Sequence, residues 1–143
     1  MASVEVRDAD FHTDRAEIRR IRYAVFVDEQ GVPESLELDD RDPLCAHVLA
    51  YVGGEAVGTG RLDLDKGGKI GRVAVTAAAR RRGVGSAIMQ WLHRRAEADG
   101  LRSVWCHAQV SAAPFYERLG YRITSDVFLE ADIEHVRMER TLP

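Results

Sequence analysis

Apolar residues recur along the chain with two different periods, and each period predicts one kind of element. Where apolar and polar residues alternate, or a short apolar run lies between turn-forming residues, the pattern predicts a β-strand. Where apolar residues return every three or four positions, as from Ile18 to Phe26, it predicts an amphipathic helix. The expected strands are residues 3–7, 45–52, 56–64, 69–75, 103–109, 121–124 and 133–140, and the expected helices are residues 14–27, residues 83–98 and a short helix between Ser111 and Gly120.

Glycine pairs and capping residues set the boundaries between these elements. Gly53-Gly54 and Gly67-Gly68 are typical of tight turns, so the strands around them are expected to form an antiparallel meander. Asp14, with Glu17 three residues later, resembles a capping box, and Ser111 is the expected N-cap of the short helix. The strand, helix and strand between residues 69 and 109 favour parallel pairing of those two strands. The expected fold class is therefore α/β (α+β), with a mixed, mainly antiparallel sheet that ends in a C-terminal hairpin at its edge.

Composition restricts the class of protein further. The 143 residues suit a single domain spanning residues 1–143, and 45% hydrophobic residues suffice for a core. A formal net charge of -3 argues against general nucleic-acid binding. The sequence shows neither an apolar run that could span a bilayer nor a signal-peptide pattern, and Cys45 and Cys106 form neither a disulfide framework nor a metal motif. We therefore expect a cytoplasmic protein without a membrane or nucleic-acid partner and without a metal.

The segment from Val73 to Ser86 carries the clearest candidate chemistry. It runs from a strand through a basic loop into a helix, and Gly83 and Gly85 lie where the helix begins. A helix start has unpaired N–H groups and a partial positive charge, and glycines there let an anion approach the backbone. The spacing excludes a Walker loop and a dinucleotide fingerprint. It indicates a cradle for a phosphate-bearing ligand at the carboxyl end of one of the two strands that the crossover connects. The same spacing is also compatible with a basic helix start that contains a tight turn and binds no ligand.

Charge is segregated along the chain. Residues 28–42 carry seven acidic side chains against one arginine, whereas residues 72–95 are basic. The two segments suit a protein that joins an anionic ligand to a cationic one, and they would equally suit two solvated surfaces.

Several motifs together resemble the GNAT N-acetyltransferase superfamily. The Arg-x-x-Gly-x-Gly loop at residues 80–85 is similar to the acetyl-CoA signature of that family, and residues 113–121 resemble its Phe-Tyr-x-x-x-Gly-Phe/Tyr segment. Residues 26–33, 69–75 and 133–138 resemble the small ElaA-like and YjcF-like subgroup. The resemblance covers the whole chain. It implies a central sheet with helices on both faces and one parallel strand pair around the cofactor.

The resemblance also implies how acetyl-CoA is bound. The pyrophosphate would lie on backbone N–H groups of residues 81–86, and the pantetheine arm would pair with residues 73–75 in a splayed gap between two strands. The N–H group of Val73 would donate to the acyl carbonyl, and the amide of Gln109 would bind the pantetheine or the helix start. The implied cofactor-binding residues are Val73, Ala74, Val75, Arg80, Arg81, Arg82, Gly83, Val84, Gly85, Ser86, Gln109 and Tyr116.

The implied chemistry is direct attack of an amine on the thioester. Tyr116 matches the tyrosine that protonates the departing CoA thiolate, a role that suits a phenol protonated at neutral pH. The residue that takes the proton of the amine is less defined. Glu29 is the first candidate, followed by Glu37, Asp39 and Asp40, with His107 and His135 behind them, and the expected acceptor-binding residues are Glu29, Glu37, Asp39, Arg72 and His107. Arg72 could instead pair with an acid of the loop.

Two functions are compatible with these residues. The first is an N-acetyltransferase that moves an acetyl group from acetyl-CoA to a primary amine of a small molecule or of lysine. The second is a non-catalytic acyl-CoA-binding sensor or regulatory module. Edge strands near the C-terminus could pair two subunits into a homodimer.

Overall fold

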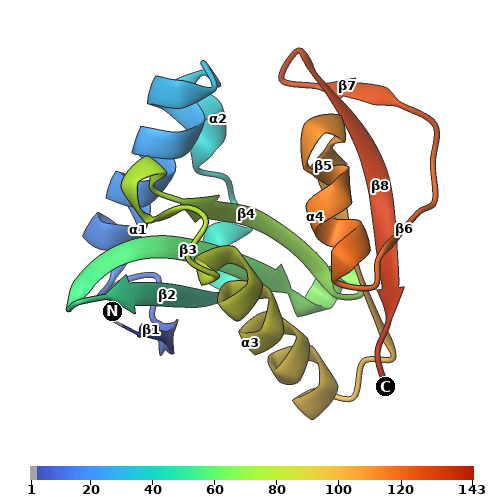
Figure 1. Cartoon of the computed structure of the whole chain (residues 1–143), viewed down its shortest axis with the longest axis horizontal. Helices are drawn as coiled ribbons and strands as arrows, with labels where there is room; N and C mark the ends of the chain where they lie inside the picture. Colours follow the sequence, from blue (N-terminus) through green and yellow to red (C-terminus); the bar gives the residue numbers. More distant parts are fainter. Residues whose placement is uncertain (1–2) are drawn as a thin grey trace.

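The described residues, 3–143, form one eight-stranded mixed sheet in this computed structural model (Figure 1). The strands follow the order β1-β2-β3-β4-β5-β8-β6, and β7 also pairs with β8. Only β4 and β5 pair in parallel, as predicted; the other pairs are antiparallel. The strands are β1 (Val4–Ala9), β2 (Ala46–Val52), β3 (Glu55–Asp63), β4 (Lys69–Val75), β5 (Ser103–Gln109), β6 (Arg122–Ile123), β7 (Phe128–Glu130) and β8 (Ile133–Thr141).

The helices cover both faces of the sheet. On one face, α1 (Arg15–Arg22) continues as a π-helical segment (Tyr23–Glu29) and is followed by α2 (Glu34–Glu37). On the other face lie α3 (Val84–Ala98) and α4 (Ala113–Arg118) (Figure 1). Each face has its own apolar cluster, and both clusters include residues of the central strands. The predicted helices and their apolar stripes are confirmed, with α1 changing to a π-helix in its second half.

Small residues bring α3 close to the sheet. A Cβ atom built on Gly58 would lie 2.8 Å from the side chain of Ile88, and one built on Gly60 would lie 2.9 Å from the same side chain. Because real Cβ atoms do not approach other atoms so closely, both positions on β3 need glycine. The predicted hairpin at Gly53-Gly54 is also confirmed, since Val52 pairs with Glu55 and both glycines have positive φ.

Two local predictions were wrong. Asp14 makes no capping hydrogen bond; its carboxylate instead pairs with Arg7 at 3.0 Å and accepts the backbone N–H of Asp10 at 2.9 Å. Ser111 lies inside a 3₁₀ turn, and α4 begins after Ala112 without a side-chain cap. The two expected C-terminal strands, β6 and β8, pair antiparallel at the sheet edge as predicted, with an additional strand, β7, between them in the sequence.

The parallel pair β4–β5 diverges soon after it forms. Only Lys69 and Ile70 of β4 have partners on β5, which are Trp105 and Cys106. Just beyond this point β4 contains an irregularity, where Arg72 has a φ of 51° and the pairing with β3 shifts register. The edge of β4 that follows Ile70 therefore faces the gap between the two strands.

None of the helices within residues 3–143 is both long and apolar enough to cross a membrane.

Candidate active site

A cavity of about 620 Å³ opens where β4 and β5 diverge. Its walls come from α2 and the residues after it, from Lys69 to Val73 on β4, from His107 to Gln109 on β5, from Tyr116 on α4 and from the turn between β7 and β8. Elements far apart in the sequence therefore meet at the splayed strands. Eight of the predicted site residues line this cavity: the candidate catalytic and acceptor-binding residues Glu37, Asp39, Arg72, His107, His135 and Tyr116, and the expected cofactor contacts Val73 and Gln109.

The arginine loop lies at the end of β4 and leads into α3. Arg81 and Gly83 both have positive φ, at 65° and 78°, and Gly83 is the N-cap of α3. The first helical hydrogen bond runs from the N–H group of Ala87 to the carbonyl of Gly83 at 3.0 Å. Among the described residues, no acceptor bonds the N–H groups of residues 81–86. These donors and the positive end of the α3 dipole form a surface with the chemistry of an anion site.

Glycine at position 85 has a packing reason as well. A Cβ atom there would lie 3.3 Å from the ring of Phe115 on α4. A side chain would therefore press against α4 beside the first turn of α3. Arg81 and Arg82 are exposed at the same place, so their charges lie near these N–H groups.

Arg80 and Glu29 are engaged with each other. The two carboxylate oxygens of Glu29 accept hydrogen bonds from the guanidinium of Arg80 at 2.7 and 2.8 Å, and Arg80 also donates to the carbonyl of Val75 at 3.0 Å. The hydrogen bonds from Arg80 lower the pKa of Glu29. A carboxylate with a lowered pKa is a weaker base, and Glu29 is not among the residues that line the cavity. This geometry disfavours Glu29 as the proton acceptor.

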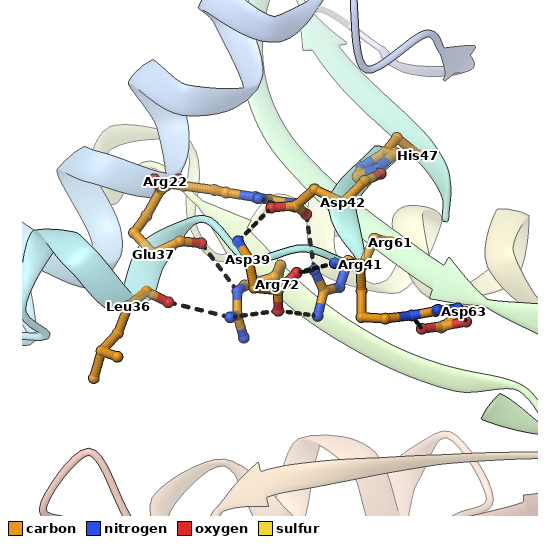
Figure 2. Close-up of polar contacts among 10 residues, drawn as sticks. All are labelled: Arg22, Leu36, Glu37, Asp39, Arg41, Asp42, His47, Arg61, Asp63 and Arg72. Atoms are coloured by element: carbon orange, nitrogen blue, oxygen red, sulfur yellow. Dashed lines mark hydrogen bonds and ion pairs between the residues drawn. The ribbon is translucent and has the colours of Figure 1, made fainter. Parts of the chain in front are cut away.

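The remaining acidic residues of the segment after α2 form a network with arginines (Figure 2). Asp39 accepts two hydrogen bonds from Arg61 at 2.7 and 2.8 Å and a third from Arg72 at 3.1 Å. The bonds from Arg61 hold the pKa of Asp39 far below its usual range. Arg72 also donates to the carbonyls of Leu36 and Glu37, each at 3.2 Å. Arg72 thus pairs with the acidic loop, which was the alternative to a substrate-binding role.

Glu37 has a different environment, although part of it lines the cavity. Its side chain is only 2% exposed, and its Oε1 atom has no hydrogen-bond partner among the described residues. Burial raises the pKa of Glu37, while the charges of Arg22 and Arg19 on α1 oppose that shift. The carboxyl group is therefore buried beneath α1 at the inner wall of the cavity, and its role as proton acceptor stays a prediction.

Tyr116 lies where the gap between β4 and β5 meets α4. Its ring packs edge-on against Phe115 and Tyr121, with centroid distances of 5.1 and 5.5 Å. Burial raises the pKa of Tyr116, so its hydroxyl keeps its proton at neutral pH. The amide of Gln109 donates to the side-chain oxygen of Gln30 at 2.8 Å, which ties β5 to the end of the π-helical segment.

Sequence reasoning missed the carboxylate that lies opposite His107. Glu130, at the end of β7, accepts a hydrogen bond from Nδ1 of His107 at 3.0 Å and lies 3.5 Å from Nε2 of His135. All three residues line the cavity. Because no element was predicted between residues 124 and 133, no local signal in the sequence could have placed Glu130 there.

Neither cysteine has the character of a nucleophile. Burial raises the pKa of Cys45 to about 11 and that of Cys106 to about 12, so both are thiols at neutral pH. Within residues 3–143, no group of three or more histidine, cysteine or acidic side chains is placed to hold a metal ion.

The fold and this arrangement of loop, splayed strands and tyrosine define an acetyltransferase of the GNAT class. The model of the acetyltransferase (GNAT) domain family matches residues 9–142, and the chain belongs to this family. The family resemblance drawn from the motifs is thereby confirmed.

Individual proteins and solved structures of this family are also similar to the chain. The chain is 39% identical to the uncharacterized N-acetyltransferase YjcF of Bacillus subtilis over 120 residues, which cover 82% of this chain and 86% of that protein. Among solved structures, it is similar to Escherichia coli ElaA, with a TM-score of 0.85 and 28% identity over 95% of this chain and 99% of that one. It is also similar to an acyl-CoA N-acyltransferase from Pseudomonas aeruginosa, with a TM-score of 0.85 and 29% identity over 97% of this chain and 100% of that one.

Proposed function

We propose that the chain is an N-acetyltransferase that transfers an acetyl group from acetyl-CoA to a primary amine of a small molecule or of lysine. The observation that carries the proposal is the set of N–H groups at residues 81–86, which have no protein acceptor in the described part of the chain and lie at the positive end of α3. They lie beyond the carboxyl end of β4, whose open edge leads into the cavity with Tyr116. A diphosphate on the loop would leave the thioester beside Val73.

The chain's own residues then have separate tasks. The N–H groups of the loop bind the diphosphate, and the edge of β4 at Val73 and Val75 pairs with the pantetheine. The N–H group of Val73 donates to the acyl oxygen as negative charge develops on it, a contribution of about 2.7–4 kcal/mol in enzymes with such donors. Tyr116 donates its proton to the departing thiolate. Because both cysteines are free thiols, we place the reaction in a reducing cytoplasm.

A sensor module is the second candidate, and one observation favours it. Two of the acidic side chains expected on the acceptor side, Glu29 and Asp39, are both neutralised by arginines. A panel of primary amines, tested for acceptor-dependent release of the CoA thiol, separates the two candidates. Thiol release with at least one amine supports the enzyme. Tight binding of CoA in calorimetry, without thiol release for any amine, leaves only the sensor.

We expect Ser86→Asp to weaken CoA binding without destabilising the fold. Residue 86 is the third position of α3, where a carboxylate is favourable to the helix dipole but repels a bound anion. A repulsion of about 1.4–2.8 kcal/mol at this range corresponds to a roughly 10- to 100-fold higher Kd for CoA. Isothermal titration calorimetry measures the Kd, and Ser86→Ala is the matched control with unchanged charge. Equal Kd values for the two variants would place the diphosphate elsewhere.

A further inference from the structure

Three side chains from three strands meet on the wall of the cavity that lies opposite α2. His107 lies on β5, Glu130 at the end of β7, and His135 on β8. One carboxylate oxygen of Glu130 is 3.0 Å from Nδ1 of His107, and the other is 3.5 Å from Nε2 of His135. The carboxylate therefore lies between two imidazoles.

Hydrogen-bond chemistry fixes which nitrogens carry protons. A carboxylate accepts only, so Nδ1 of His107 is the donor in its 3.0 Å contact with Glu130. In neutral His107, Nε2 then has the free electron pair. Nδ1 of His135 is 2.7 Å from the carbonyl of Ile133, which also accepts only, so this nitrogen is protonated as well. Nε2 of neutral His135 would therefore face Glu130 as a second acceptor, and their contact becomes favourable when one proton lies between them.

The rings are held by neighbouring aromatic side chains. Phe128 lies edge-on to His107 at a centroid distance of 4.9 Å and stacks with His135 at 6.0 Å. Trp105 also lies edge-on to the His107 ring, at a centroid distance of 5.5 Å. A ring that packs against two aromatic side chains, with one nitrogen bonded to a carboxylate, presents its other nitrogen in a constant direction.

Other charged groups surround the cluster. Lys69 of β4 lines the same cavity and lies above the ring of Trp105 at 5.2 Å, and Arg137 of β8 is the register partner of His107. The titratable side chain of Tyr116, on α4, also lines this cavity. On the opposite wall, Asp39 is already paired with Arg61 and Arg72, and Glu37 is buried. Nε2 of His107, in contrast, has no hydrogen-bond partner among residues 3–143.

We propose that His107 is the general base that accepts the proton of the acceptor amine, and that Glu130 is the positioning residue that directs Nε2 of His107 into the cavity. This inference rests on the proposed N-acetyltransferase function and identifies the proton acceptor of that site. His135 stabilises the arrangement after proton uptake, because the contact between Glu130 and His135 improves when an additional proton enters the cluster.

The proton and electron balance closes without another reactant. The ammonium form of the acceptor gives one proton to Nε2 of His107, and the electron pair left on nitrogen forms the bond to the carbonyl carbon. The carbon–sulfur pair leaves with the sulfur, which takes a proton from Tyr116. The second proton of the nitrogen returns to Tyr116, and His107 passes its proton to solvent. The products are the amide, the CoA thiol and one proton.

The kinetic test compares three variants with an amine that supports thiol release by the wild-type protein. We expect His107→Gln to lower kcat/KM by about 100-fold or more. We also expect the variant to lose the fall in activity that protonation of the base causes at low pH in the wild type. Glu130→Gln should retain that fall, with a smaller loss of rate. His12→Gln, which changes an exposed histidine before α1, is the control and should match the wild type.

A second measurement does not depend on turnover. Long-range proton–nitrogen correlation spectra of ¹⁵N-labelled protein report the tautomer of each histidine. We expect the Nδ1-protonated form for neutral His107 and its loss in Glu130→Gln. An unchanged CoA affinity of His107→Gln, with partial rescue of His107→Ala by added imidazole, would exclude a mere loss of structure.

The outcomes separate this inference from the function on which it rests. A wild-type protein that releases thiol, together with a His107→Gln variant of unchanged pH profile, overturns the role of His107 and leaves the acetyltransferase standing. An Nε2-protonated tautomer of neutral His107 overturns the role of Glu130. Absence of thiol release from the wild type with every amine overturns both the function and the inference.

Discussion

Asp42→Ala is expected to lower the free energy of unfolding by about 3–5 kcal/mol, because it leaves a buried arginine without its partner. The side chain of Asp42 is 1% exposed and lies 3.0 Å from the guanidinium of Arg22, which is fully buried. The same carboxylate accepts hydrogen bonds from Arg61 at 2.8 Å and from the backbone N–H of Asp39 at 3.0 Å (Figure 2). Arg61 retains Asp39 in the variant, whereas Arg22 has no other ion pair among residues 3–143. Urea denaturation at neutral pH measures the difference.

Asp65→Ala is the matched control for this prediction. Asp65 lies in the turn after β3 and pairs at 3.3 Å with Arg41 of the segment after α2, but its side chain is 75% exposed. Exposed ion pairs contribute about 0–1 kcal/mol, so this variant should unfold close to the wild type. Equal stability losses for Asp42→Ala and Asp65→Ala would show that the buried network does not hold the segment after α2 in place.

The same network makes the free energy of unfolding depend on pH in the acidic range. Burial opposes the ionisation of Asp42, but Arg22 and Arg61 outweigh it and lower its pKa; Arg61 lowers the pKa of Asp39 in the same direction. An unfolded aspartate titrates near pH 3.9, so below that pH the unfolded chain binds more protons than the native one. The stabilisation is complete above this range and is lost as the pH falls through the native pKa values. The difference between wild type and Asp42→Ala should therefore shrink from pH 7 towards pH 3.

The sheet could be predicted in detail because its signals are local. The bounds of β4 and β5 agree with the expected residues 69–75 and 103–109, since each apolar run is bounded by turn-forming residues. The π-helical segment and β7 were not foreseen. Phe128–Glu130 has no alternation that distinguishes it from loop, and it becomes a strand only because β8 offers an edge.

The candidate site also has a part that local sequence signals predict and a part that depends on the fold. The anion loop is contiguous in sequence, so its spacing alone indicated the cradle. Whether Glu29 and Asp39 can face a substrate instead depends on arginines far away in the sequence. Glu29 pairs with Arg80, and Asp39 pairs with Arg61. The separate acidic and basic segments indicated that ion pairs could form between them. Which carboxylates pair with arginines and which face the substrate is determined only by the three-dimensional fold.

Tyr116→Phe should lower kcat by about 100-fold and leave the Kd for acetyl-CoA unchanged. General acid catalysis contributes about 10²- to 10⁴-fold in enzymes, and efficiency falls as the pKa of the acid moves away from the working pH. Because burial raises the pKa of Tyr116, its proton is held more tightly, and we expect the lower end of that range. The change affects only the step in which charge develops on sulfur, so binding is unaffected. Steady-state thiol release and calorimetry measure the two quantities.

Tyr121→Phe provides the opposite pattern and so tests the assignment. The hydroxyl of Tyr121 is 2.6 Å from Nε2 of the buried His93 and is not part of the cavity wall, whereas the hydroxyl of Tyr116 has no hydrogen-bond partner among residues 3–143. Removing the Tyr121 hydroxyl leaves Nε2 of His93 unpaired, while Nδ1 keeps Arg140 at 2.8 Å, and we expect a cost of about 1–3 kcal/mol in unfolding free energy with turnover unchanged. Removing the Tyr116 hydroxyl leaves no protein group unpaired, so turnover should fall while stability is retained. If Tyr116→Phe turns over as fast as the wild type, the thiolate is protonated by another group, and water in the cavity becomes the acid.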